Sequence, residues 1–215
     1  METHYHINDF IFFVRQRSSD IPILKEVILF DNYKIVGKLK AHDIVIDIGG
    51  HIGSFSIFAS SMGTSVLTYE PVKRNFDLLE KNVEINGFPV NIHKMAVMGH
   101  LDTQKVYVKD FNFGGSNMYN VNNDPDFSED VFCTTLDKIF EDNHLSSCDF
   151  LKLDCEGSEL EILENSGHLS DIKTIAMEYH GMKMRDSIMK LLSRTHEQTD
   201  DRHSDAMGTM IFERK

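Results

Sequence analysis

The chain of 215 residues suits one domain, which at this length can bury about 70% of the surface that the unfolded chain exposes. Its formal net charge of −12 argues against nonspecific binding to nucleic acid or to an anionic membrane, because phosphate groups are held by Lys and Arg. The three cysteines have no metal-site spacing, and no signal peptide or apolar run of about 20 residues is present. We therefore expect a cytoplasmic protein without a membrane partner, folded as one domain over residues 1–215.

The first 40 residues predict a small β extension in front of the main domain. Residues 10–14 and 27–30 are short apolar runs on either side of a polar turn that contains Pro22. Each run has the length and composition of a strand. We divide the chain accordingly into an N-terminal β extension, residues 1–40, and a core, residues 41–215.

Strands and helices are predicted to alternate along the core. In chain order we expect a strand at 45–48, a helix at 54–61, a strand at 65–69, a helix from Pro71 to a glycine cap at Gly87, a strand at 91–97, a short helix capped by Thr134, a strand at 150–153, a helix at 159–165, a strand at 174–179, a helix at 182–194 and a strand at 209–213. Such alternation is typical of a doubly wound α/β sheet.

Two segments interrupt the alternation. Residues 105–108 and 129–132 predict an added pair of strands around a loop at 112–127, which is rich in Asn, Gly and Asp. Residues 197–205, rich in histidine and aspartate, are most simply a solvated loop.

The run from Val45 to Gly53, VIDIGGHIG, carries the strongest functional signal. A buried strand with a carboxylate near its end enters a glycine turn and then a helix, an arrangement that holds nucleotide-like ligands. A histidine, His51, stands where the dinucleotide fingerprint has its second glycine. Because Asp47 lies two residues before the first glycine, the site suits a ligand with an ammonium group, such as S-adenosylmethionine.

Four predicted strands carry an acid at their end: Asp47, Glu70, Asp154 and Glu178. In a doubly wound sheet these ends meet at one edge, where ligands bind. Carboxylates crowded there repel one another, so the set favours a cationic or hydroxyl-rich ligand. Glu70 also lies 17 positions beyond Gly53, close to the offset of about 20 at which an acid binds ribose hydroxyls.

A second group of acids follows the strand at 150–153. Asp154, Glu156 and Glu159 lie around Gly157, which allows a tight turn from strand to helix. We expect Asp154 to point into the cleft and Glu156 to lie on its rim. Glu159 falls in the first turn of a helix, where a carboxylate also complements the helix dipole.

These motifs resemble those of the FkbM-type methyltransferases, which have a strand reading D-x-G-A-N-x-G and later K-x-D-x-E-G-x-E. The corresponding segments here are Asp47 to Gly53 and Lys152 to Glu159. Further similarities, within residues 10–180, lie at Arg15 with Ser18-Ser19-Asp20, at Tyr69-Glu70-Pro71 with Asn75, at Lys94 to Val97, at Thr135-Leu136-Asp137 and at Met177 to His180. The chain departs from the family at Gly50-His51, where Ala-Asn is usual.

The resemblance implies a doubly wound, Rossmann-like class I methyltransferase sheet and an S-adenosylmethionine-dependent O-methyltransferase. It implies that Asp47 and the turn residues Gly49, Gly50, His51 and Gly53 hold the methionine part of the cofactor. It also implies that Glu70 holds the ribose, that Ala96 and Val97 face the adenine, and that Asp154 lies near the reacting methyl group. Asn75 joins this set as a further cofactor-binding candidate.

Transfer to a neutral alcohol needs a general base, and the candidates are Asp154, Glu156 and His180. We expect the acceptor to be a hydroxyl of a small molecule, such as a sugar or a secondary metabolite, and not a nucleic acid. No metal site is predicted, because the carboxylates lack a defined ligand spacing. Two alternatives stay open: an NAD-linked oxidoreductase on a Rossmann fold, and a non-catalytic relative that binds the cofactor. The oligomeric state is not predicted.

Overall fold

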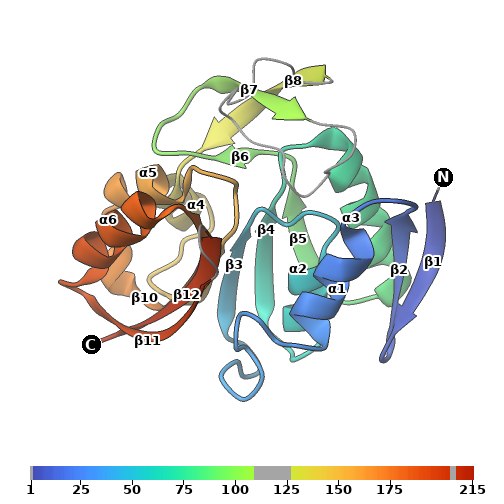
Figure 1. Cartoon of the computed structure of the whole chain (residues 1–215), viewed down its shortest axis with the longest axis horizontal. Coiled ribbons are helices and arrows are strands. Elements are labelled where there is room, and N and C mark those ends of the chain that lie inside the picture. Colours follow the sequence, from blue (N-terminus) through green and yellow to red (C-terminus); the bar gives the residue numbers. More distant parts are fainter. Residues whose placement is uncertain (1, 109–126, 204–206) are drawn as a thin grey trace.

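A central sheet of seven strands organises the computed structural model, which describes residues 2–108, 127–203 and 207–215 (Figure 1). The strand order is β11-β12-β10-β9-β3-β4-β5. The strands are β3 (Ile44–Ile48), β4 (Ser65–Tyr69), β5 (Val90–His93), β9 (Cys148–Leu153), β10 (Ile172–His180), β11 (His196–His203) and β12 (Met207–Arg214). The five strands from β10 to β5 are parallel, whereas β12 is antiparallel to β10 and β11 is antiparallel to β12.

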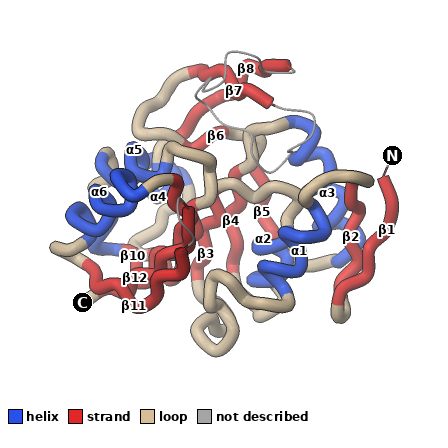
Figure 2. The backbone as a smooth tube through the Cα atoms, viewed as in Figure 1, coloured by secondary structure: helices blue, strands red, loops and turns tan. Residues whose placement is uncertain are grey.

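Helices cover both faces of this sheet, as Figure 2 shows. One face carries α1 (Asp20–Ile28), α2 (Ser54–Ser60) and α3 (Lys73–Asn86), and the other carries α4 (Leu136–Asp142), α5 (Glu159–Glu164) and α6 (Met182–Leu192). A hydrophobic core lies on each face of the sheet, and alternate residues of β3 point to opposite faces. Ile46 and Ile48 pack in the core on the side of α4–α6, and Val45 packs in the core on the side of α1–α3. The predicted doubly wound α/β sheet is confirmed.

The chain changes direction across the sheet beside β3. After β3 the chain adds β4 and β5 on one side, and it later adds β9 and β10 on the other side. The segments that leave the ends of β3 and β9 therefore diverge, which opens a crevice at the carboxyl edge of the sheet.

The N-terminal extension is a hairpin followed by a helix, not a pair of strands flanking a turn. β1 (Glu2–Ile7) and β2 (Phe10–Arg15) pair with each other, and the amide oxygen of Asn82 on α3 accepts a 2.6 Å hydrogen bond from the backbone N–H of Phe13. The strand expected at 27–30 is wrong. Leu24, Val27 and Ile28 form one buried face of α1, and Pro22 lies in the first helical turn, where its missing N–H costs nothing.

The C-terminal part holds a second wrong prediction. The segment expected to be a solvated loop, 197–205, belongs largely to β11, which pairs with β12 along the edge of the sheet. An edge strand that pairs on one side only can be polar. The acidic sequence of β11 therefore lacks the apolar pattern by which a strand is predicted. The final strand predicted at 209–213 is confirmed as β12.

A small second sheet lies above the carboxyl edge in the view of Figure 1. The strand predicted at 91–97 is split into β5 and β6 (Ala96–Val97), and β6 pairs with β8 (Phe127–Thr134). The predicted added pair is confirmed, since β7 (Thr103–Val108) runs antiparallel to β8. The loop predicted between them lies almost wholly outside the described residues.

Of the three helix ends predicted at Pro71, Gly87 and Thr134, only the one at Gly87 is confirmed, since α3 begins at Lys73. Gly87 caps α3 with a φ of 69°. The first turn of α4 is capped by the hydroxyl of Thr135, which accepts from the N–H of Lys138, and not by Thr134, which ends β8.

None of the helices in the described ranges is both long enough and apolar enough to cross a lipid bilayer. A short 3₁₀ helix, Leu169–Asp171, leads into β10.

We propose that the extension folds together with the core as one domain. Phe12 of β2 is fully buried in the same core as Leu24, Val45 and Phe55. Substituting Phe12→Ala is expected to lower the free energy of unfolding by about 3–5 kcal/mol while urea denaturation stays a single transition by circular dichroism. Phe30→Ala, at a side chain that is 63% exposed, serves as the control and should change little. Two separate transitions would contradict the single domain.

Candidate active site

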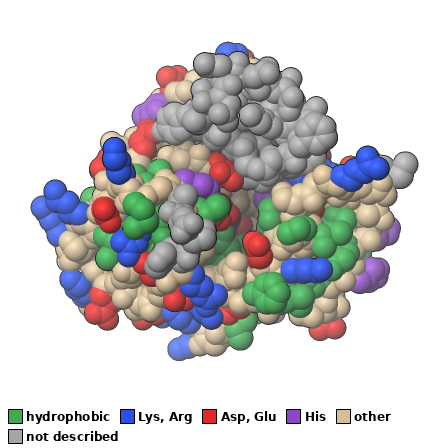
Figure 3. All heavy atoms as spheres, in the orientation of Figure 1, with side chains coloured by type: hydrophobic (Ala, Val, Ile, Leu, Met, Phe, Trp, Pro, Cys, Tyr) green, Lys and Arg blue, Asp and Glu red, His purple; other side chains and the backbone are tan. Residues whose placement is uncertain are grey.

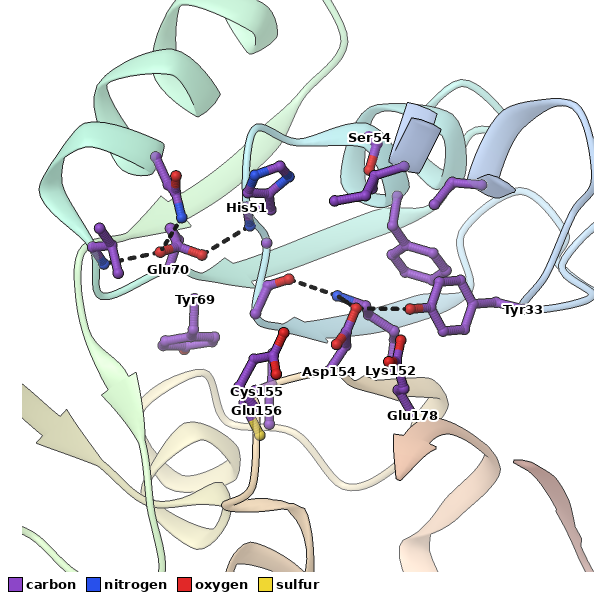
Figure 4. A pocket seen from close by; sticks show the side chains of 18 of the residues that line it. Tyr33, His51, Ser54, Tyr69, Glu70, Lys152, Asp154, Cys155, Glu156 and Glu178 are labelled. Atoms are coloured by element: carbon purple, nitrogen blue, oxygen red, sulfur yellow. Dashed lines mark hydrogen bonds and ion pairs between the residues drawn. The ribbon is translucent and has the colours of Figure 1, made fainter. Parts of the chain in front are cut away.

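A cavity of about 280 Å³ opens at the carboxyl ends of β3, β4 and β9, at the point where the strand order reverses (Figure 4). On the face shown in Figure 3, acidic side chains lie at the hollow in the middle of the molecule. Most of the residues predicted for the site line this cavity: Gly49, Gly50, His51, Glu70, Asn75, Ala96, Val97, Asp154 and Glu156. Three predicted residues do not line it: Asp47, Gly53 and His180.

The glycine turn after β3 is in direct contact with the turn after β9. Gly49 has a φ of 84°, and a Cβ there would lie 1.8 Å from the backbone oxygen of Asp154. Gly50 does not adopt a positive φ, so a glycine is not required there for its backbone angle. It is needed for space, because its Cβ would lie 2.3 Å from Cγ2 of Thr68. His51 has a φ of 50°, a region that histidine and asparagine adopt more readily than most residues.

Asp47 lies beneath the cavity and does not face it. Its side chain is fully buried, with Oδ1 3.0 Å from Nζ of Lys152, and the hydroxyl of Ser56 donates to Oδ2. Nζ of Lys152 also donates to the backbone oxygen of Gly49 at 2.6 Å. Burial alone would lower the pKa of Lys152, but the carboxylates of Asp47 and Asp154 raise it. Asp47 is therefore connected to the cavity through Lys152 and the glycine turn.

Glu70 joins the end of β4 to the glycine turn. Its Oε2 accepts from the backbone N–H of His51 at 2.8 Å, and its Oε1 accepts from the N–H of Val72 at 2.9 Å and from Nδ2 of Asn75 at 3.3 Å. Burial raises the pKa of Glu70 to about 7, although these hydrogen bonds oppose the rise. The carboxyl group is thus held in one orientation at the wall of the cavity.

A second group of carboxylates lines the other end of the cavity: Asp154, Glu156 and Glu178. Burial, followed by repulsion from Asp154, raises the pKa of Glu156 and of Glu178 to about 8. Nε2 of His180 lies 3.5 Å from Oε2 of Glu156 and 3.5 Å from Oε1 of Glu178. His180 therefore contacts the carboxylates from behind instead of facing the cavity.

Glu159 has a structural contact that explains its place in the sequence motif. It is fully buried, and its two oxygens accept from the backbone N–H groups of Cys155 and Gly157, each at 2.9 Å. The side chain therefore closes the turn between β9 and α5. Its neighbour Glu156 adopts a φ of 60° in the same turn, which is a strained conformation of the kind found at functional sites.

Tyr33 is a site residue that the sequence did not reveal. It lies in the loop after α1, and its hydroxyl donates to Oδ2 of Asp154 at 2.9 Å. Its ring packs edge-on against Phe55, with 5.4 Å between the ring centroids. A lone tyrosine in a polar loop carries no pattern, so only its contact with the distant β9 turn, 121 positions along the chain, identifies it.

Within the described residues, no group of three or more His, Cys, Asp and Glu side chains is placed to hold a metal ion. The polar groups that line the cavity include carboxylates, backbone groups and a few hydroxyls. This set suits an organic ligand with ammonium and hydroxyl groups.

The sequence profile of the methyltransferase FkbM domain matches residues 47–201. No curated protein sequence is significantly similar to the chain. The profile match runs from the end of β3 through most of β11 and includes both sequence motifs, whereas the hairpin, α1 and Tyr33 precede it.

Solved methyltransferase structures share the fold at low sequence identity. The ribosomal protein L11 methylase of Lactobacillus delbrueckii subsp. bulgaricus has a TM-score of 0.53 at 14% identity, over 84% of this chain and 74% of that one. A precorrin-6y C5,15-methyltransferase of Geobacter metallireducens has a TM-score of 0.52 at 10% identity, over 97% and 95%. The Pyrococcus abyssi tRNA (uracil-54, C5)-methyltransferase, in complex with S-adenosyl-L-homocysteine, has a TM-score of 0.55 at 10% identity, over 99% and 44%.

The chain spans only 57% and 44% of two similar structures that are named tRNA methyltransferases, and 55% of each of two structures named Trm5 and Trm5b. These similarities show the class I, Rossmann-like fold.

The contact between the two turns yields a prediction for Gly49. We expect Gly49→Ala to unfold the protein or abolish ligand binding, because the new Cβ would overlap the backbone of Asp154. Gly37→Ala is the matched control: its φ of 79° is similar and nothing lies within 4 Å of its Cβ, so it should cost only about 1 kcal/mol. Thermal denaturation and calorimetric titration with S-adenosylhomocysteine would measure both effects. Equal losses in the two variants would contradict the clash.

Proposed function

Because this chain belongs to the FkbM methyltransferase family and is an S-adenosylmethionine-dependent enzyme, we propose that it methylates a hydroxyl group of a small molecule. The family membership overturns the alternative of an NAD-linked oxidoreductase. The observation that carries the acceptor proposal is the group of carboxylates at the far end of the cavity, where two have pKa values raised to about 8.

The residues of the cavity fit the cofactor. Gly49, Gly50 and His51 line the cavity at the turn after β3, and Glu70 is a fixed carboxylate at the offset expected for ribose hydroxyls. We propose that Gly49, Gly50 and His51 hold the methionine part, that Glu70 holds the ribose with support from Asn75, and that Ala96 and Val97 border the adenine. Asp47 and Gly53 would contribute from outside the lining, Asp47 through Lys152 and Gly53 through the packing of the turn against α3. The cofactor supplies a methyl group that its sulfonium already activates.

The chain's own residues would then hold the acceptor and remove its proton. Oδ2 of Asp154 accepts from Tyr33, so we propose that Oδ1 orients the hydroxyl of the acceptor. Glu156 lines the cavity, and its raised pKa brings it close to the strength at which a base works best near neutral pH. We therefore propose Glu156 as the general base. His180, 3.5 Å from Oε2 of Glu156, would position this carboxyl group and pass its proton toward solvent.

The acceptor class follows from the same lining. Carboxylates accept hydrogen bonds from hydroxyl groups, which favours a sugar or another hydroxyl-rich metabolite, as in secondary metabolism. Lys152 is the one Lys or Arg side chain among the described lining residues, and it is already bonded to Asp47 and Gly49. Together with the net charge of −12, this lining counts against a nucleic-acid acceptor, although several structurally similar enzymes act on tRNA according to their names.

The proposed cofactor contacts predict the effect of one substitution. Glu70→Ala should weaken the binding of S-adenosylhomocysteine about 10- to 100-fold in calorimetric titration, because hydrogen bonds to a charged group contribute about 1.5–3 kcal/mol. Glu164→Ala, at an exposed side chain of α5, is the control and should bind as the wild type does. NAD⁺ should not bind. An affinity that is indifferent to Glu70→Ala would show that the ribose lies elsewhere.

The proposed base predicts a pH profile. A carboxylate base is active when deprotonated, so the rate of methyl transfer from labelled S-adenosylmethionine should rise with pH and level off above about 8. Glu156→Gln should lower the rate about 100-fold or more and remove this rise, whereas His180→Asn should lower it less. The assay would use a panel of sugars and polyhydroxy compounds with total RNA beside it. Labelled RNA would contradict the acceptor class, and a larger loss in His180→Asn than in Glu156→Gln would make His180 the base.

A further inference from the structure

The guanidinium group of Arg15 stands at the junction of three side chains beside the cavity. Its Nη2 donates to Oδ1 of Asp20 at 2.7 Å and lies 2.9 Å from Nε2 of His51. Its Nη1 donates to Oδ1 of Asn75 at 2.7 Å. Arg15 ends β2, so it comes from the segment that precedes the family match at residue 47, yet two of its partners, His51 and Asn75, line the cavity.

Asp20 holds the guanidinium in place. It is fully buried, and its Oδ2 accepts from Nε of Arg15 at 3.0 Å and from the backbone N–H of Arg15 at 2.7 Å. Burial alone would raise the pKa of Asp20, but the hydrogen bond and the charge of Arg15 lower it below its ordinary value. The two-pronged pairing of a carboxylate with a guanidinium leaves little freedom of rotation. The orientation of Nη1 and Nη2 toward the cavity is thereby set.

An arginine can only donate hydrogen bonds, and this decides the polarity of both partners. Nε2 of His51 must accept from Arg15, so the proton of the neutral imidazole lies on Nδ1. Oδ1 of Asn75 must accept as well, so the amide turns its Nδ2 toward Oε1 of Glu70, at 3.3 Å. Glu70 also accepts from the backbone N–H of His51. The guanidinium of Arg15 is therefore linked to Glu70 twice, through the side chain of Asn75 and through residue His51.

We propose that Arg15 is a positioning residue of the cofactor site, which sets the tautomer of His51 and the amide orientation of Asn75 and through them the carboxylate of Glu70. The inference rests on the proposed role of Glu70 and His51 in holding the cofactor. It gives the N-terminal extension a further role at the site, beside the extension residues that line the cavity directly, such as Ser19, Ile23 and Tyr33.

The groups that face His51 predict what happens without Arg15. The pKa of His51 is lowered to about 4, chiefly by burial and in part by the charges of Arg15 and Lys152, while Asp20 and Asp154 oppose the shift. Nε2 of His51 lies 3.4 Å from Oδ1 of Asp20. If the guanidinium is removed, the buried carboxylate of Asp20 faces the imidazole without a competing cation, and the protonated form of His51 is favoured.

The test compares Arg15→Met and Arg15→Lys with the wild type. Lysine keeps the positive charge beside Asp20, but it lacks the planar guanidinium group. It therefore cannot place one nitrogen against His51 and another against Asn75 at the same time. Arg185→Met is the matched control, because Arg185 pairs with Asp201 at 2.5 Å on a part of the chain away from the cavity lining. The measurements are the affinity for S-adenosylhomocysteine by calorimetry and the ¹⁵N shifts of His51 by nuclear magnetic resonance, with His51→Asn used to assign its signals.

We expect both Arg15 variants to bind S-adenosylhomocysteine at least tenfold more weakly than the wild type, and Arg185→Met to bind as the wild type does. We also expect His51 to be neutral with Nδ1 protonated in the wild type at pH 7, and its pKa to be higher in Arg15→Met than in the wild type. Should Arg15→Met not fold, Arg15→Lys carries the test. Wild-type affinity and an unchanged His51 tautomer in Arg15→Lys would overturn the inference, whereas absence of binding to the wild type would overturn the proposed cofactor contacts themselves.

Discussion

The ion pair between Lys152 and Asp47 is the constraint on which the rest of the site depends. The two residues stand opposite each other on the neighbouring central strands β9 and β3, and both are buried. Removing either partner would leave a charge in the protein interior, which is costly because no water can replace the lost contact. Lys152 also binds the backbone oxygen of Gly49, so the charge that joins the two strands aligns the turns that leave them as well.

The polar groups around the cavity form two networks that meet at the glycine turn. Lys152, Asp154 and Tyr33 make up one, and Glu70, Asn75 and Arg15 with Asp20 make up the other. Both networks include residues of the N-terminal segment, Tyr33 in the first and Arg15 with Asp20 in the second. Burial raises the pKa values of Glu70, Glu156 and Glu178, and repulsion from Asp154 adds to the rise at Glu156 and Glu178, while the charge of Lys152 opposes it at all three.

Much of the site could be predicted from local sequence, and the exceptions have identifiable causes. The glycine turn, Glu70 and Asp154 line the cavity because strands of a doubly wound sheet deliver their carboxyl ends to one edge. Asp47 does not, because alternation along β3 places it on the same face as Val45, against Ser56 of α2. The sequence offers His180 as one of three candidate bases, but its position at the end of β10 does not say whether the ring faces the cavity or the back of Glu156.

The sequence by itself determined the alternation of strands and helices, the doubly wound sheet and the two motifs that identify the family, since apolar periodicity and glycine-rich turns are local properties. Only the tertiary structure decided that residues 20–28 form a helix and 196–203 an edge strand, because packing and pairing partners far along the chain settle those segments. It also decided the roles of Tyr33 and Arg15. Their contacts span 121 and 60 positions, and a hydrogen bond across such a separation has no signature in the local order of residues.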